Sequence, residues 1–323
     1  MFKNICVLFS LVFCLQNSHS MVRISKCKNF LEIEKITRSL CGNVVVAFDF
    51  DGVLMKNVWD SPLLNRFQDS RKISESSIKK HQRLAEELKK EAAKYQISNG
   101  QSGLAGIVPD LEKICHASIQ INYKLQEAYH KFANFVNNQV ILADPSIPET
   151  LYKLNRNNIP FFCLTANYDA CSLVRLNQFD LLKLTAYFRK PFLLKGASTS
   201  ESAYFLRTDF NTVFTSKIIR REIPVGTPEN APCVYHGGNQ ISPVVFSKNP
   251  EIYYTYFSKN CTSLSKGDVL EQLIADGVFP YRLEHLVLVD DMRKNLEKFG
   301  NACRKLGINF WGIHFSNDEN WLL

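Results

Sequence analysis

Runs of consecutive apolar residues recur along the chain and alternate with segments of helical periodicity. The clearest runs are Val44–Phe48, Ile159–Leu164 and Leu286–Val289. Continuous β-branched and apolar runs are typical of strands that are buried on both faces of a parallel sheet. The segments between and around them predict helices at 30–40, 146–154, 170–184 and 266–275, a helix ending at Leu306, and a last strand at 308–315. This alternation predicts an α/β fold, a Rossmann-like parallel sheet with helices on both faces.

Two of the predicted helices begin with residues that favour a helix N-terminus. Ser146 and Glu149 have the spacing of a capping box, in which each side chain bonds to the other residue's backbone N–H. Ser265 precedes the helix that starts at Lys266 and is expected to cap it.

Two long segments interrupt the sheet pattern. Residues 59–138 combine helical spacing with high charge and contain no convincing buried strand, so they predict an inserted helical unit. Residues 188–260 are less regular, and the best strand within them is 252–257. The predicted core therefore comprises 21–58 and 139–323, with 188–260 as an elaborated insertion.

The first twenty residues have the pattern of a secretory signal peptide. Lys3 is their only charged residue, an apolar stretch runs from Ile5 to Leu15, and small residues flank His19. A buried N-terminal strand or helix is one alternative, and a lipoprotein signal using Cys14 is another, disfavoured by the bulky Phe13. The prediction is a signal at 1–20, an exported protein, periplasmic or secreted, and no membrane span after signal removal.

The charged residues and the cysteines limit which ligands and partners are expected. With Lys3 removed, 38 of the 39 basic residues face 31 acidic ones, and the basic residues are interleaved with acids. No arginine-rich or RNA-binding pattern accompanies them, so nucleic-acid binding is not expected. Eight cysteines remain after the signal, none in a Cys-x-x-Cys pair, which gives no support to a zinc or thioredoxin-like site. Export permits disulfides, but their connectivity is open, as is the oligomeric state.

Acidic residues follow two of the predicted strands. Asp49 and Asp51 come directly after Val44–Phe48, and Asp290 and Asp291 end the run at 286–289. The carboxyl ends of parallel strands share one edge of the sheet, which is where ligands bind in this class of fold. An Asp-x-Asp turn alone can be simply solvated, and Asp-Asp after a strand can simply cap the next helix.

In their order along the chain, these residues and two others resemble the four motifs of the haloacid dehalogenase-like superfamily. The segment Phe48-Asp49-Phe50-Asp51-Gly52-Val53 is similar to the first motif. Thr165, Lys266 and Asp290-Asp291 match the second, third and fourth. The resemblance covers about 42–58, 144–185 and 262–316, and it extends more loosely to a group of secreted bacterial members.

The resemblance implies an aspartyl-phosphate mechanism that depends on Mg²⁺. Asp49 is then the nucleophile and Asp51 the general acid and base. Thr165 and Lys266 bind the phosphate. The implied metal ligands are Asp49, the backbone carbonyl of Asp51, and Asp290, with Asp291 as direct or indirect support. Residues 59–138 occupy the place of the superfamily's helical cap, which selects substrate.

The sequence therefore predicts an exported Mg²⁺-dependent phosphatase, a phosphoric monoester hydrolase that acts on a small phosphorylated substrate. An aspartate at position 51 points to phosphatase or phosphotransferase chemistry within the superfamily. Two alternatives stay open: a phosphotransferase using the same site, and a catalytically silent secreted binding or effector protein on the same scaffold. The identity of the substrate is not predicted.

Overall fold

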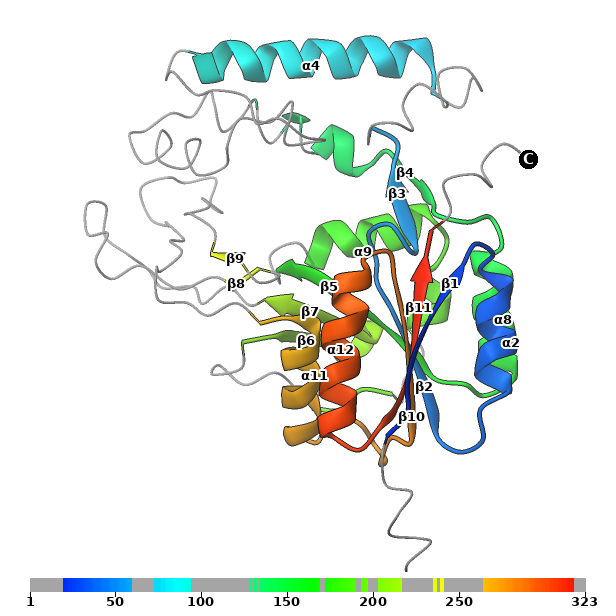
Figure 1. Cartoon of the computed structure of the whole chain (residues 1–323). Helices are drawn as coiled ribbons and strands as arrows, with labels where there is room; N and C mark the ends of the chain where they lie inside the picture. Colours follow the sequence, from blue (N-terminus) through cyan, green and yellow to red (C-terminus); the bar gives the residue numbers. More distant parts are fainter. Residues whose placement is uncertain are drawn as a thin grey trace, which may run out of the picture.

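A seven-stranded sheet forms the centre of the structure (Figure 1). The structure is a computed structural model that describes residues 20–59, 73–93, 128, 131–132, 134–168, 172–189, 193–196, 203–216, 235–236, 239–240 and 264–316. The strand order is β1-β11-β10-β2-β5-β7-β6, and all neighbours are parallel except the antiparallel pair β6 and β7. The strands are β1 (Val22–Cys27), β2 (Val44–Phe48), β5 (Phe161–Tyr168), β6 (Phe205–Arg207), β7 (Thr212–Ser216), β10 (His285–Asp290) and β11 (Asn309–Phe315).

The central strands bury both of their faces, as their unbroken apolar runs predict. Along β2, Val44, Val46 and Phe48 enter one hydrophobic cluster, whereas Val45 and Ala47 enter the other. Successive side chains of a strand point to opposite faces, so a strand in the middle of the sheet needs apolar residues at every position.

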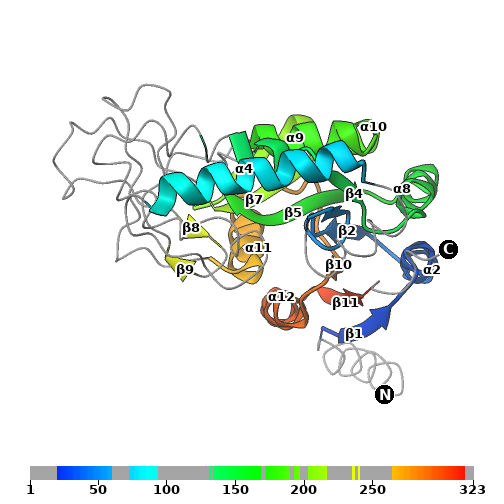
Figure 2. The same ribbon diagram turned by 90° about the horizontal axis from the view of Figure 1, so that it is seen from above.

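Helices cover both faces of the sheet, and the predicted Rossmann-like α/β fold is confirmed (Figure 2). One face carries α2 (Leu31–Arg38), α8 (Ile147–Arg156), α9 (Ser172–Leu181) and α10 (Thr185–Phe188). The opposite face carries α11 (Lys266–Ala275) and α12 (Arg293–Lys305). A short 3₁₀ helix, Thr208–Phe210, joins β6 to β7.

Both predictions of helix capping can be compared with the structure. Ser265 caps α11 in a capping box with Asp268, as expected for a serine before the first helical turn. The capping box predicted for Ser146 and Glu149 is wrong, because Ser146 makes no side-chain cap bond. Its hydroxyl instead donates to Asp144 Oδ1 at 2.5 Å. Ser146 also has backbone angles of φ −83° and ψ 0°, which differ from the extended conformation typical of a capping residue.

A helix lies above the carboxyl ends of the strands. This is α4 (Glu75–Ala93), and Figures 1 and 2 show it passing over the end of the sheet. It buries His81, Leu84 and Leu88, and the His81 ring stacks on Trp59 with 4.0 Å between centroids. A two-stranded antiparallel ladder, β3 (Met55–Asn57) and β4 (Val140–Leu142), carries the chain out of the core and back.

Several predictions fall on residues that the structure does not describe. The predicted signal peptide lies outside the described residues except for Ser20. The same holds for much of 59–138 and for the strand predicted at 252–257. Within 188–260, the described residues include β6, β7 and a short hairpin of β8 (Tyr235–His236) with β9 (Asn239–Gln240). Two strands of the main sheet therefore come from this segment.

Four of the cysteines lie in described segments, and each of these is a free thiol: Cys27, Cys41, Cys163 and Cys303. Among the described helices, none combines the length and the apolar character needed to cross a bilayer.

The close packing of α11 on α12 gives a prediction about stability. A Cβ at Gly267 would lie 2.7 Å from the backbone oxygen of Lys298, which is inside van der Waals contact. Gly267→Ala should therefore lower the free energy of unfolding by about 1–3 kcal/mol, measured by urea denaturation, because the helices must move apart. Glu271→Ala on the same helix removes only an exposed ion pair with Lys305 and should cost at most about 1 kcal/mol. Equal losses in the two variants would contradict the packing argument.

Candidate active site

The chain turns sharply where β2 ends. The N–H groups of Leu54 and Met55 both donate to the carbonyl of Phe50 at 3.0 Å, and Gly52 N–H donates to Met55 O at 2.8 Å. Gly52 has a φ of +78°, which other residues adopt only with strain. A Cβ there would also lie 2.2 Å from Asp291 Oδ2. Glycine at this position thus lets the carboxylate of Asp291, which follows the neighbouring strand β10, lie against the turn.

A buried ammonium group holds two carboxylates together at this edge of the sheet. Lys266 Nζ lies 2.8 Å from Asp49 Oδ2 and 2.6 Å from Asp290 Oδ2. The exposed fractions are 4% for Lys266, 6% for Asp49 and 0% for Asp290, so water contributes little to their solvation. The two aspartates follow or end neighbouring strands, β2 and β10, and Lys266 is the first residue of α11.

The electrostatics of these groups follow from their burial and their partners. Burial raises the pKa of Asp49 to about 8, against the opposing effect of the Lys266 charge. Burial lowers the pKa of Lys266, but the charges of Asp49 and Asp290 outweigh it, so this pKa lies above its ordinary value. Lys266 therefore remains an ammonium group at neutral pH. Its position in the first turn of a helix is unfavourable to a cation, and the two carboxylates compensate for that.

Asp290 and Asp291 are neighbours in sequence but differ in their surroundings. Asp290 Oδ1 accepts from Met292 N–H at 2.8 Å, and Asn295 Nδ2 donates to both oxygens of Asp290, at 3.1 and 3.2 Å. The Asp291 side chain accepts no hydrogen bond from another residue in the part of the chain that the structure describes. Burial and the charge of Asp290 raise the pKa of Asp291 to about 6. Of these two neighbours, Asp291 is thus the one whose side-chain oxygens have no described donor on another residue and can bind a ligand.

Three carboxylates converge here in a way that suits a metal ion. Asp49, Asp290 and Asp291 each offer an oxygen within 4.8 Å of the others'. Carboxylate oxygens are hard ligands, which Mg²⁺ prefers. The donor set and the glycine beside Asp291 therefore fit the metal that the sequence predicts.

The carboxylate of Asp51 belongs to a separate arrangement of polar groups. Its Oδ2 accepts from Asn167 Nδ2 at 2.9 Å and from Arg175 Nη2 at 3.0 Å. Asn167 Nδ2 also lies 3.0 Å from the hydroxyl oxygen of Thr165, which is buried at the edge of the sheet. The structure thus links Thr165 to Asp51 through Asn167, beside the cluster that contains Asp49.

Sequence reasoning missed three residues of this region: Asn167, Arg175 and Asn295. Asn167 lies two positions after Thr165 on β5, but the pairing of β5 with β7 shifts register between Thr165 and Tyr168, so simple strand alternation does not predict their contact. Asn295 lies in the first turn of α12, close in sequence to Asp290. Nothing in the local pattern indicates Arg175, which is 124 positions from Asp51.

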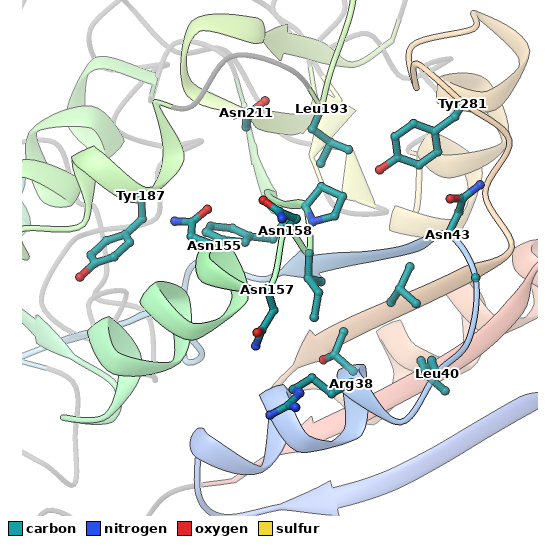
Figure 3. Close-up of a pocket in the computed structure, with 16 residues that line it drawn as sticks. Arg38, Leu40, Asn43, Asn155, Asn157, Asn158, Tyr187, Leu193, Asn211 and Tyr281 are labelled. Atoms are coloured by element: carbon teal, nitrogen blue, oxygen red, sulfur yellow. The ribbon is translucent and has the colours of Figure 1, made fainter.

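A separate cavity in the described part of the chain lies away from this site. This cavity of about 780 Å³ is lined by residues such as Asn43, Asn158 and Tyr281 (Figure 3). It lies beside Val44 and Phe161, where β2 and β5 begin, whereas Asp49 follows the other end of β2. None of the sequence-predicted site residues lines it.

Comparisons with known proteins give little information about the function of the chain. A family model described as "Protein of unknown function (DUF2608)" matches residues 247–320, a range that includes Lys266, Asp290 and Asp291. No curated protein matches the chain. A solved structure from Thermotoga maritima, described as a "putative beta-phosphoglucomutase", is similar over 86% of this chain and 89% of that chain, with 16% sequence identity and a TM-score of 0.37. At this identity and TM-score, the likeness does not transfer a function.

The buried state of Asp49 predicts how stability depends on pH when no metal is bound. Its pKa is raised from 3.8 to about 8, so the unfolded chain loses this proton at lower pH than the folded protein. Stability should therefore fall as the pH rises from about 4 to 8. Urea midpoints measured in EDTA at pH 5 and pH 8 should differ less in Asp49→Asn than in wild type. An unchanged difference in Asp49→Asn, with the exposed Asp180→Asn as control, would contradict this assignment.

Proposed function

We propose that the chain is a Mg²⁺-dependent phosphohydrolase of the haloacid dehalogenase-like superfamily that acts on a small phosphoric monoester through Asp49. The observation that carries the proposal is the buried Lys266 ammonium between Asp49 and Asp290, with Asp291 beside them. A carboxylate that attacks a phosphate dianion must overcome repulsion between two anions. A buried cation in contact with the nucleophile reduces that repulsion without having to reorganise during the reaction.

The proposed reaction has two steps. In the first, an oxygen of Asp49 bonds to phosphorus as the bond to the ester oxygen breaks, and Asp51 gives its proton to the departing oxygen. In the second, water attacks phosphorus, the bond to Asp49 breaks, and Asp51 takes the proton of the water. The buried hydroxyl of Thr165 would bind a phosphate oxygen. Phosphoryl transfer depends on this kind of positioning and charge neutralisation.

Mg²⁺ would be held by Asp49, Asp291 and the backbone carbonyl of Asp51, and when bound it would neutralise charge on the phosphate oxygens. Asp290 then supports the site chiefly by holding Lys266. Both Asp290 oxygens already accept hydrogen bonds, from Lys266, Asn295 and Met292, whereas the Asp291 oxygens do not have such partners among the described residues. These hydrogen bonds support a closer metal contact for Asp291 than for Asp290, whereas the sequence resemblance implies Asp290 as the direct ligand.

Export and substrate selection form part of the same proposal. The pattern of residues 1–20 supports removal of a signal peptide and release outside the cytoplasm, to be checked by N-terminal sequencing of the exported protein. The location of α4 over the carboxyl ends of the strands supports a cap role for 59–138. A cap of this kind excludes water and contacts the leaving group.

Replacing the proposed nucleophile tests the function. Asp49→Asn should lower turnover of 4-nitrophenyl phosphate with Mg²⁺ by roughly 10³-fold or more, because an amide oxygen cannot form the phosphoenzyme. The matched control is Asp180→Asn on the exposed surface, which should retain wild-type turnover. Activity of Asp49→Asn equal to wild type would overturn the proposal. Phosphate transfer to added alcohols in place of water would instead identify a phosphotransferase.

The two acidic residues after β10 should respond differently to metal. Asp291→Asn should raise the Mg²⁺ concentration for half-maximal activity by roughly 10-fold to 100-fold, with activity largely recovered at high Mg²⁺. Asp290→Asn should lower activity at every Mg²⁺ concentration, because it weakens the contact that positions Lys266. Initial rates over a Mg²⁺ titration would measure both effects. The reverse pattern would assign the closer metal contact to Asp290.

A further inference from the structure

The Asp51 carboxylate accepts its described hydrogen bonds at one of its two oxygens. Asn167 Nδ2 and Arg175 Nη2 both donate to Oδ2, at 2.9 and 3.0 Å. No described residue donates to Oδ1. An amide N–H and a guanidinium N–H can only donate, so Oδ2 must present lone pairs to both. When Asp51 is protonated, its proton therefore lies on Oδ1, the oxygen that is free to face a substrate.

Arg175 is itself fixed from several sides. Its Nη1 donates to Gln178 Oε1 at 2.7 Å, one turn further along α9. Its guanidinium group lies over the ring of Phe50, 5.0 Å from the centroid, where a cation is attracted by the aromatic face. Only 13% of the Arg175 side chain is exposed, whereas half of the Asp51 side chain is. The more buried partner of this ion pair is thus the arginine.

Gln178 connects this arrangement to the segment that leads back from α4. Gln178 is 1% exposed, and its Nε2 donates to the backbone carbonyl of Asn137 at 2.9 Å. Asn177 Nδ2 donates to Asn138 Oδ1 at 2.5 Å, so consecutive residues of α9 hold consecutive residues of that segment. The position of Arg175 therefore depends on the chain that enters β4.

We propose that Arg175, anchored by Gln178, is the positioning residue of the acid–base step: it binds Asp51 Oδ2 so that the proton is delivered from Oδ1 to the leaving oxygen of the substrate. This inference rests on the proposed function and assigns a role to a residue outside the four motifs. Arg175 does not touch the reacting atoms. Its loss leaves Asn167 as the one described donor to Oδ2, so the Asp51 carboxylate is held less firmly and its proton is less strictly confined to Oδ1.

The dependence on leaving group separates this role from a purely structural one. 4-Nitrophenolate departs without a proton, whereas the alkoxide of glycerol 2-phosphate needs one. Since kcat/KM reports steps through formation of the phosphoenzyme, it isolates the acid step from the later attack of water. Arg175→Met should lower kcat/KM for glycerol 2-phosphate by roughly 10²-fold and that for 4-nitrophenyl phosphate by less than about 5-fold.

Three further variants complete the test. Arg175→Lys keeps the charge but loses the forked geometry, so it should show a smaller loss with the same leaving-group dependence. Gln178→Met should also lower kcat/KM more for the alkyl ester than for the aryl ester. Arg189→Met is the matched control, since Arg189 also lies over a phenylalanine ring, that of Phe210, and should not change either value. Thermal unfolding checks that each variant is folded.

The outcomes distinguish this inference from the function on which it rests. A selective loss for glycerol 2-phosphate in Arg175→Met and Arg175→Lys supports the inference. Equal losses for both substrates in folded variants overturn it and leave the phosphohydrolase intact. No Mg²⁺-dependent turnover of either substrate by the wild-type protein overturns the proposed function and the inference with it.

Discussion

The contact of one buried ammonium group with two buried carboxylates constrains the rest of the structure. Lys266 reaches both Asp49 and Asp290 only because β2 and β10 are neighbours and α11 begins just beyond their carboxyl ends. Removing one member of a buried ion pair leaves an uncompensated charge, which typically costs about 3–5 kcal/mol. Next to Lys266, Gly267 allows the first turn of α11 to lie close against the backbone of α12.

The elements around this contact are those that the sequence predicts best. The apolar run Val44–Phe48 and the helix Lys266–Ala275 agree with the structure at both ends, because burial on two faces and a capping serine leave clear local patterns. β1 was missed because it is an edge strand, with most of its residues exposed or partly exposed. β6 and β7 were missed because they are short and include polar residues, and pairing between neighbours in space defines them.

The residues of the site also differ in how well the sequence predicts them. The motif residues Asp49, Lys266 and Asp290 each follow or begin a predictable element, so the shared edge of the sheet brings them together. The roles assigned to them remain predictions. Arg175 and Gln178 lie within an ordinary helical pattern, and their importance depends on contacts with residues far away in sequence. Local periodicity contains no information on such contacts, which arise from how α9 packs on the turn after β2.

The balance of charge argues most directly for a divalent cation. Asp49, Asp290 and Asp291, when ionised, oppose the single charge of Lys266 and leave a formal charge of minus two, while Asp51 and Arg175 neutralise each other. A site with that charge repels a phosphate dianion, and burial strengthens the repulsion. One divalent ion cancels the excess. Burial is the main cause of the raised pKa values of Asp49 and Asp291, because it favours the protonated carboxyl groups when no such ion is bound. The arrangement that disfavours these charges in the metal-free protein is therefore one that suits a divalent cation.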